Sequence, residues 1–359
     1  MINVTKYLLI SLISAILSLI LVELFLELSK KEKNSKFIYY LNKKKSNNNY
    51  TLAYPPILSL RNQNKLDHLG GISHSKTIVC NESGYFSEFL SDRYGFNNPD
   101  NEWDKKGKKI YLIGDSFVFG SCVNRPNDIA SNLRLLQDNT IINLGYGGNG
   151  PLLNYATFIE YIENKNYIDL IYFFYSGNDL KDLKYEIKQD SLNKYLKKKN
   201  YKKNFLDNQK EINLKLNEKI KTKIDQKDKS YLIKDIIIFK NIKSLISKFI
   251  FTEKKNNFIN EKEEFLKIIE LIKNQLEINQ SNFYFVYLPS FKELMIKKND
   301  YYDMIIKLNK IDINVIDLNK EINSRVIDIR KIYAKNNKLN HFNEDGYKII
   351  SQILSEKIF

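Results

Sequence analysis

Four short polar stretches of this chain carry side chains that could act on an ester or another acyl group. In GDSF, Ser116 follows an apolar run and offers a hydroxyl that can act as a nucleophile. In GYGGNG, Gly148 could bring its backbone N–H close to a substrate, because glycine has no side chain to block the approach. In SGND, the Asn178 amide offers two further donors. In NHFNEDGY, His341 could take the proton from the serine hydroxyl.

The residue types in these stretches complement one another chemically. A serine hydroxyl is a weak nucleophile until a base takes its proton, and the chain has only three histidines. Because His68 and His74 lie in an irregular N-terminal part, His341, just before the last predicted helix, is the favoured base. The serine N–H, the Gly148 N–H and the Asn178 amide could together hold a tetrahedral oxyanion, each donor contributing typically ~3 kcal/mol.

The elements around these stretches would bring them together. Short runs rich in Ile, Val, Tyr and Phe alternate with helical patterns, which indicates a mainly parallel five-stranded sheet in a three-layer α/β/α domain. In the common strand order 2-1-3-4-5, the ends of the first three strands meet at one edge. The predicted strands are 109–114, 140–146, 168–176, 282–289 and 313–318, and the predicted helices are 127–137, 151–164, 261–279, 300–310 and 344–357.

The remainder of the chain divides by composition. Residues 1–29 contain an apolar run long enough to cross the ~30 Å hydrocarbon layer as a helix, and no small-residue cleavage site closes it. We therefore expect an uncleaved membrane anchor. Residues 30–107 read as a linker and an irregular N-terminal segment, and 108–359 as the α/β domain. Within that domain, the Lys-rich stretch 183–260 interrupts the alternation and reads as a largely helical insertion.

Charge and cysteine usage limit the possible partners. The net charge of +15 comes from lysines spread along the chain, without a basic stripe interleaved with aromatic residues, so we expect no nucleic-acid partner. GYGGNG lacks the lysine of a phosphate-binding loop, and we expect no nucleotide cofactor and no metal. Cys80 and Cys122 could form one bridge in an oxidising compartment or be two unrelated thiols.

In order and spacing, the four stretches resemble the four blocks of the SGNH (GDSL-type) hydrolases, which are serine esterases and acyltransferases of flavodoxin-like fold. The resemblance covers 108–359 apart from the insertion. It implies that Ser116 is the nucleophile, that Gly148 and Asn178 donate to the oxyanion, and that His341 is the general base.

The sequence departs from the family at one position of the catalytic group. An aspartate usually lies two or three residues before the histidine and orients the imidazole, but here Lys338 and Leu339 stand there. A backbone carbonyl or an asparagine could hold the ring and leave a Ser-His dyad. A different acid, such as Glu344 or Asp345, could also take the place of the aspartate.

The anchor and the stretch RYGFNNP (93–99) resemble membrane-anchored members that add or remove acyl groups on cell-envelope polysaccharides. By this analogy we expect a serine esterase or O-acyltransferase acting on acyl, chiefly acetyl, esters of a surface glycan, with a membrane protein as a candidate acyl donor. That substrate requires a periplasmic domain, whereas the lysines after the span favour a cytoplasmic one. The alternative is a non-catalytic envelope protein that binds carbohydrate or serves as a scaffold.

Overall fold

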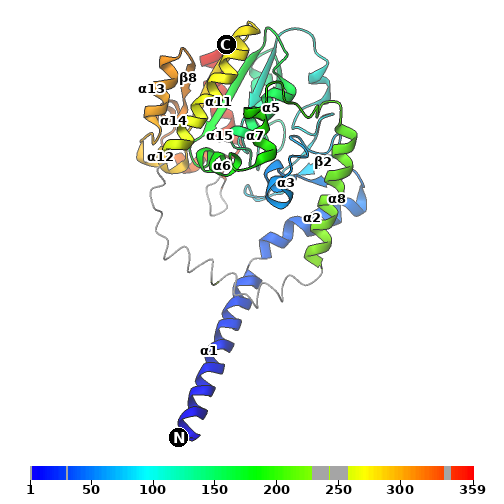
Figure 1. The fold of residues 1–359 in the computed structure, drawn as a ribbon, viewed down its shortest axis with the longest axis vertical. Helices are drawn as coiled ribbons and strands as arrows, with labels where there is room; N and C mark the ends of the chain where they lie inside the picture. The colour runs from blue at the N-terminus through cyan, green and yellow to red at the C-terminus, as the bar shows by residue number, and fades with distance from the viewer. Residues whose placement is uncertain (1, 30, 229–241, 243–257, 335–340) are drawn as a thin grey trace. The chain divides into compact units, whose positions relative to one another are not determined.

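The computed structural model describes residues 2–29, 31–228, 242, 258–334 and 341–359 (Figure 1). The chain forms two compact units, one made of 1–46 with 218–257 and the other of 47–217 with 258–359. The second unit contains every residue of the four polar stretches.

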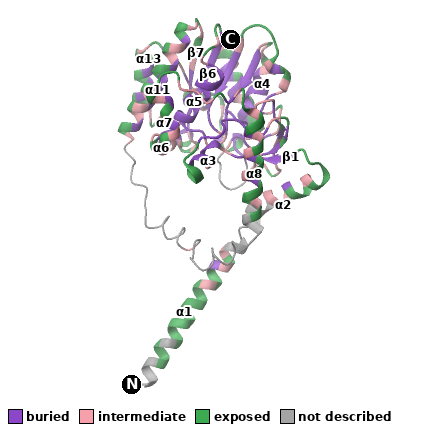
Figure 2. Ribbon diagram, turned by 45° about the vertical axis from the view of Figure 1, so that its right-hand side comes forward, coloured by how far each residue is buried: buried purple, intermediate pink, exposed green. Residues whose placement is uncertain are grey.

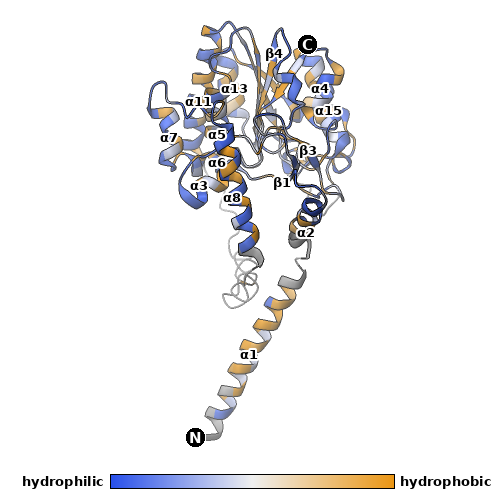
Figure 3. Cartoon of the chain, turned by 90° about the vertical axis from the view of Figure 1, so that its right-hand side faces the viewer, coloured by the Kyte–Doolittle hydropathy of each residue, from blue (hydrophilic) through white to orange (hydrophobic). Residues whose placement is uncertain are grey.

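The first unit begins with helix α1 (Ile2–Ser29), which contains an apolar stretch. Its 21 residues from Lys6 to Leu26 have a mean hydropathy of 2.6, so this helix is long and apolar enough to span a membrane (Figure 3). Helix α2 (Lys31–Ser46) follows where the sequence predicts a linker. The stretch contains no Gly or Pro and is rich in lysine, a good helix former, and three lysines in its last turn complement the helix dipole.

The second unit is built on a parallel sheet with the strand order β5-β4-β6-β7-β8. In chain order this is 2-1-3-4-5, as the sequence predicts, and every neighbouring pair is parallel. The structure therefore confirms the flavodoxin-like α/β arrangement. The strands are β4 (Lys109–Ile113), β5 (Thr140–Asn143), β6 (Asp169–Tyr175), β7 (Asn282–Leu288) and β8 (Asn314–Asp317).

Helices cover both faces of this sheet, and the strands between them are buried (Figures 2 and 3). On one face, Ile110, Leu112 and Phe173 pack with side chains of α4 and α15. On the other face, Tyr172 and Phe174 contact Phe265 of α11. Alternate residues of one strand thus enter two different cores, which is why the strand runs are almost continuously apolar. The helices of these layers include α4 (Ile129–Leu136), α5 (Pro151–Tyr161), α11 (Ile259–Ile278), α14 (Leu318–Arg325) and α15 (Glu344–Ile358).

The predicted insertion is helical where it is described. Helices α7 and α8 fall within it, α6 and α11 overlap its ends, and the apolar patch at 232–239 lies outside the described residues. Two short helices separate β7 from β8, and a 3₁₀ turn precedes the C-terminal loop. These elements are α6 (Asp179–Glu186), α7 (Asp190–Lys197), α8 (Gln209–Asp228), α12 (Phe291–Ile296), α13 (Tyr302–Lys310) and η2 (Ile329–Ile332).

The segment before β4 has more structure than its sequence indicates. It forms a second, three-stranded sheet in the order β1-β2-β3, with one parallel and one antiparallel pair. Each strand is only three residues long, too short for an alternating pattern to show in the sequence. The elements are β1 (Tyr50–Leu52), α3 (Pro56–Gln63), β2 (Lys76–Ile78), β3 (Glu88–Leu90) and the 3₁₀ turn η1 (Asp100–Trp103).

Candidate active site

Ser116 lies in a tight turn directly after β4, which lies between β5 and β6 in the sheet. The turn is closed by backbone hydrogen bonds from Phe119 N to Asp115 O and from Ser121 N to Ser116 O, both 3.0 Å. The loops after the two neighbouring strands pack against this turn. The ring of Phe117 lies 4.6 Å from that of Tyr175 at the end of β6, between ring centroids, and the ring of Phe119 lies 4.6 Å from that of Tyr146 after β5.

The Ser116 hydroxyl meets the His341 imidazole across the sheet edge. Oγ of Ser116 lies 2.9 Å from Nε2 of His341, although the two residues are 225 positions apart. His341 lies in the loop before α15, and its ring packs on that of Phe117 at 5.2 Å between centroids. The contact has the geometry in which a histidine accepts the proton of an attacking hydroxyl.

A carboxylate that the sequence did not indicate contacts the other nitrogen of the ring. Oε2 of Glu82 lies 2.9 Å from Nδ1 of His341. A carboxylate only accepts hydrogen bonds, so Nδ1 is the protonated nitrogen and Nε2 accepts from Ser116. Neither acid considered from the sequence occupies this place: Glu344 accepts a hydrogen bond from Tyr85, and Asp345 is exposed in the first turn of α15.

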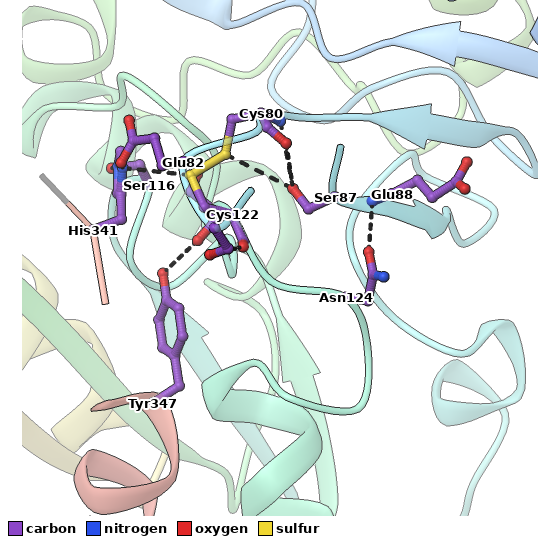
Figure 4. Close-up of a disulfide and its surroundings, with 11 residues drawn as sticks. Cys80, Glu82, Ser87, Glu88, Ser116, Cys122, Asn124, His341 and Tyr347 are labelled. Atoms are coloured by element: carbon purple, nitrogen blue, oxygen red, sulfur yellow. Dashed lines mark hydrogen bonds and ion pairs between the residues drawn. A yellow bond between two sulfur atoms is a disulfide. The ribbon is translucent and has the colours of Figure 1, made fainter. Parts of the chain in front are cut away.

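Glu82 reaches His341 because the segment before β4 is tied to the loop after Ser116. Cys80 and Cys122 form a disulfide with a Cα–Cα distance of 5.2 Å, which resolves the pairing left open by the sequence (Figure 4). Glu82 lies two residues after Cys80. The one sequence signal that could have led to Glu82 was therefore this cysteine pair.

The residues of RYGFNNP also join the segment before β4 to the parallel sheet. The Asn97 amide donates to the carbonyl of Phe119 at 3.1 Å, and the Asn98 amide donates to the carbonyl of Asn143 at 2.9 Å. Arg93 forms ion pairs with Asp100 and Asp104, which closes this segment on itself. The two asparagines thus hold both the serine loop and the end of β5.

Gly148 has a backbone conformation that favours glycine. Its φ is +80°, in the left-handed region, and a Cβ placed on it would lie 3.1 Å from Cγ2 of Ile57. The glycine loop is pressed against the serine turn, because a Cβ on Gly145 would lie 2.5 Å from Cβ of Val118. A residue with a side chain at either position would move this loop.

Asn178 begins helix α6, whose carboxylates hold both it and the glycine loop. The Asn178 amide donates to Oδ2 of Asp182 at 2.6 Å. One turn further, Glu186 accepts from the backbone N–H groups of Gly150 and Leu152, both at 2.8 Å, at the start of α5. One side of α6 therefore positions two loops that flank Ser116.

Four carboxyl groups of α6 and of the Ser116 turn have raised pKa values, and burial is the main cause. Burial raises the pKa of Asp115, beside the nucleophile, and raises that of Asp179 well above its usual range, with a further contribution from the Asp115 charge. Burial also raises the pKa of Asp182 to about 6 and that of Glu186 to about 8. A raised pKa means that these carboxyls hold their protons to higher pH than exposed carboxyls do, beside Ser116 and along α6.

The described residues contain one group whose atoms are spaced for a metal, namely Glu82, Cys122 and His341, with ligand atoms within 4.8 Å of one another. The sulfur of Cys122 is bonded to Cys80, so it is not a thiolate ligand in this state.

Comparison with solved structures finds distant likenesses. No family model and no curated protein matches the chain. A solved structure described as a lipolytic protein of the G-D-S-L family from Desulfitobacterium hafniense DCB-2 shows 15% identity and a TM-score of 0.39, covering 70% of this chain and 100% of that one. A second, the YxiM protein of Bacillus subtilis, shows 11% identity and a TM-score of 0.38; the match covers 70% of this chain but only 56% of that longer protein.

The strand order and the meeting of the serine and histidine blocks at one sheet edge decide the architecture. The second unit has a flavodoxin-like α/β architecture that resembles the SGNH hydrolases in its strand order and in the meeting of its serine and histidine blocks. Relative to the usual SGNH arrangement, the acid beside the histidine comes from a different part of the chain, the segment that precedes the first strand of the domain.

Proposed function

We propose that this protein is a serine esterase or O-acyltransferase that acts on acetyl or related acyl esters of a cell-envelope polysaccharide. The observation that carries the proposal is the contact of Ser116 Oγ with His341 Nε2 at 2.9 Å, in a ring whose other nitrogen faces a carboxylate. A histidine in this tautomer can take the hydroxyl proton as the oxygen attacks a carbonyl carbon.

The reaction proceeds through an acyl-enzyme. Ser116 Oγ bonds to the carbonyl carbon, its proton moves to His341 Nε2, and the carbonyl oxygen becomes negative. The Ser116 N–H, the Gly148 N–H and the Asn178 amide stabilise this oxyanion. His341 then gives the proton to the leaving alcohol, and water or a sugar hydroxyl takes the acyl group in the second half of the cycle.

Two features support a site outside the cytoplasm. Helix α1 is long enough to anchor the chain in a membrane, and the disulfide between Cys80 and Cys122 is of a kind that persists in oxidising compartments. The disulfide outweighs the lysines after the span, because the whole chain is rich in lysine. The alternative of a non-catalytic module relied on a missing acid, and the Glu82 carboxylate 2.9 Å from Nδ1 of His341 weakens that argument.

The test is labelling of the full-length protein in detergent micelles with a fluorophosphonate probe, beside Ser116→Ala and His341→Ala. We expect stoichiometric labelling of Ser116 in the parent protein and loss of at least ~10³-fold in labelling rate in both variants. A folded parent protein that does not react would refute the serine mechanism.

The location requires its own experiment. A reporter that is active only outside the cytoplasm, fused after Phe359 of the full chain, should be active. Activity of a cytoplasmic reporter in its place would exclude an envelope glycan as substrate while leaving the ester chemistry intact.

A further inference from the structure

The environment of the His341 ring contains two groups that face Nδ1. Oε2 of Glu82 lies at 2.9 Å and Sγ of Cys122 at 3.7 Å. The His341 and Glu82 side chains are 20% and 24% exposed, so the pair is largely shielded from water. The neighbouring sequence from 334 to 340 contains no carboxylate, and Glu82 supplies the charge that this stretch lacks.

The loop that carries Glu82 depends on contacts outside itself. It joins β2 to β3 without regular structure, its ends are paired by backbone hydrogen bonds from Val79 N to Ser87 O and from Ser87 N to Cys80 O, and further contacts lead to the loops around the nucleophile and His341. Ser83 Oγ donates to the carbonyl of Cys122 at 2.7 Å, and the hydroxyl of Tyr85 donates to Glu344 at 2.9 Å. Two attachments lie close to Glu82 along the chain: the hydrogen bond of Ser83 and the disulfide of Cys80. Both lead to Cys122.

Cys122 is itself held in a defined orientation. Its φ is +72°, in the left-handed region, which is uncommon for a residue with a side chain. The neighbouring Ser121 carbonyl accepts a hydrogen bond from the buried Tyr347 of α15 at 2.9 Å (Figure 4). Cys122, in the loop after Ser116, is therefore held in place, and the disulfide holds Cys80 and the loop of Glu82 to it.

We propose that Glu82 is the positioning acid of His341 and that the Cys80–Cys122 disulfide holds Glu82 against the ring, so that this catalytic group is complete only in the oxidised protein. The inference rests on the proposed function, because it assigns the residue that orients the base of that reaction. Glu82 keeps the proton of His341 on Nδ1 and stabilises the imidazolium that forms when Nε2 takes the serine proton.

Reduction would release this arrangement by ordinary thiol–disulfide exchange. A thiolate of a dithiol reagent attacks one bridge sulfur, and the second thiol of the reagent then closes its own disulfide. Cys80 and Cys122 leave as thiols, having gained two electrons and two protons from the reagent. The freed Cys122 sulfur would remain near Nδ1 and compete with Glu82 for it.

The first experiment compares glutamates of the same segment in the full-length protein. We expect Glu82→Gln to lower kcat about 10²- to 10⁴-fold with little change in KM, and Glu82→Asp to recover part of the loss. The acid limb of its pH profile should also move to lower pH, because no carboxylate stabilises the imidazolium. Glu88→Gln is the matched control, since Glu88 lies in the same segment and away from His341 (Figure 4). Equal effects of Glu82→Gln and Glu88→Gln would overturn the proposal.

The second experiment tests the bridge with a double-mutant cycle. Glu82→Gln is made in the parent protein and in Cys80→Ser/Cys122→Ser, and the parent is also assayed with dithiothreitol and a chelator. The chelator prevents a metal from gathering on the freed sulfur, His341 and Glu82. We expect the glutamine substitution to cost less than about 10-fold without the bridge, against about 10²-fold or more with it. The same factor in both backgrounds would overturn the role of the disulfide.

A third readout is independent of activity. The chain has three histidines, so selective ¹⁵N-histidine labelling gives three imidazole signals, and His341→Ala identifies one of them. We expect the neutral His341 ring to be protonated on Nδ1 in the oxidised protein and to become a mixture of tautomers in Glu82→Gln. An unchanged ring would overturn the positioning role. A changed ring in a protein that does not react with the probe would refute the proposed function and leave the positioning role standing.

Discussion

The two groups that flank Ser116 are assembled in different ways. The candidate oxyanion donors Gly148 and Asn178 follow the strands on either side of β4, and α6 holds the glycine loop at Gly150 and the Asn178 amide through nearby hydrogen bonds. The candidate base and its carboxylate come from distant parts of the chain, since Glu82 and His341 are 259 positions apart, and a disulfide fastens the loop of Glu82. Ser116 thus lies between two halves of the site. The locally built half contains Gly148, Asn178 and α6, and the half closed by long-range contacts contains Glu82 and His341.

This difference implies that the two halves fail under different conditions. A reductant acts on the half that contains Glu82, whereas a change of pH acts on the buried carboxyls of α6 and of the Ser116 turn. Experiments that perturb one half and leave the other unchanged therefore test whether the halves are independent.

The largest effect in the locally built half is expected for Asn178→Ala. Its amide donates to an oxygen that becomes negative only in the transition state, so kcat should fall about 10²- to 10³-fold while KM changes little. Steady-state kinetics on a chromogenic acetyl ester measure both. The factor should be the same before and after treatment with dithiothreitol. A factor that disappears in the reduced protein would show that the two halves are coupled.

The same contrast explains which parts of the site the sequence reveals. Ser116, Gly148 and Asn178 each follow a strand whose apolar run ends in a polar turn, a pattern contained in about ten consecutive residues. The sheet order follows from the same runs. Glu82 lies in an irregular loop between two three-residue strands, and no local pattern marks it. Its place depends on a pairing between two cysteines that the sequence alone leaves undecided.

The fold shows the same division between local and long-range information. The five predicted strands and five predicted helices of the α/β domain agree with the structure to within a few residues, because each shows its hydrophobic period over its length, whereas α12 and α14 lie where the sequence analysis predicts no helix. The small sheet before β4 does not, since its strands are stabilised by pairing between segments that are far apart for their length. A pattern needs several repeats before it can be detected, and three residues do not supply them.

A smaller effect is expected for Gly148→Ala. The alanine would have to keep a φ of +80° beside Ile57, so we expect the loop to shift, kcat to fall about 10- to 100-fold and the free energy of unfolding to fall by about 1–2 kcal/mol. Gly107→Ala is the matched control, because Gly107 also has a positive φ, of +93°, and a Cβ there would meet nothing within 4 Å. It should lose similar backbone stability and keep its kcat. An equal loss of kcat in both variants would mean that the effect is one of stability alone.

The smallest effect concerns the pH dependence of stability in the locally built half. Burial raises the pKa of Asp182 from 3.8 to about 6, so the folded protein binds this proton more tightly than the unfolded chain. The stabilisation is complete below pH 4 and is lost as the pH rises through 6. Each pKa unit corresponds to about 1.4 kcal/mol, and partial exposure reduces the total to about 1–2 kcal/mol.

Asp182→Asn should therefore flatten the fall in melting temperature between pH 4 and pH 7, because the amide keeps the shape of the side chain and does not ionise. Thermal unfolding of both proteins at several pH values gives the difference directly. Reduction of the disulfide should lower the curves of both proteins equally and leave this difference unchanged, since the bridge lies in the other half. A difference that depends on the redox state would show that α6 responds to the loop of Glu82, and the two halves would then be one cooperative unit.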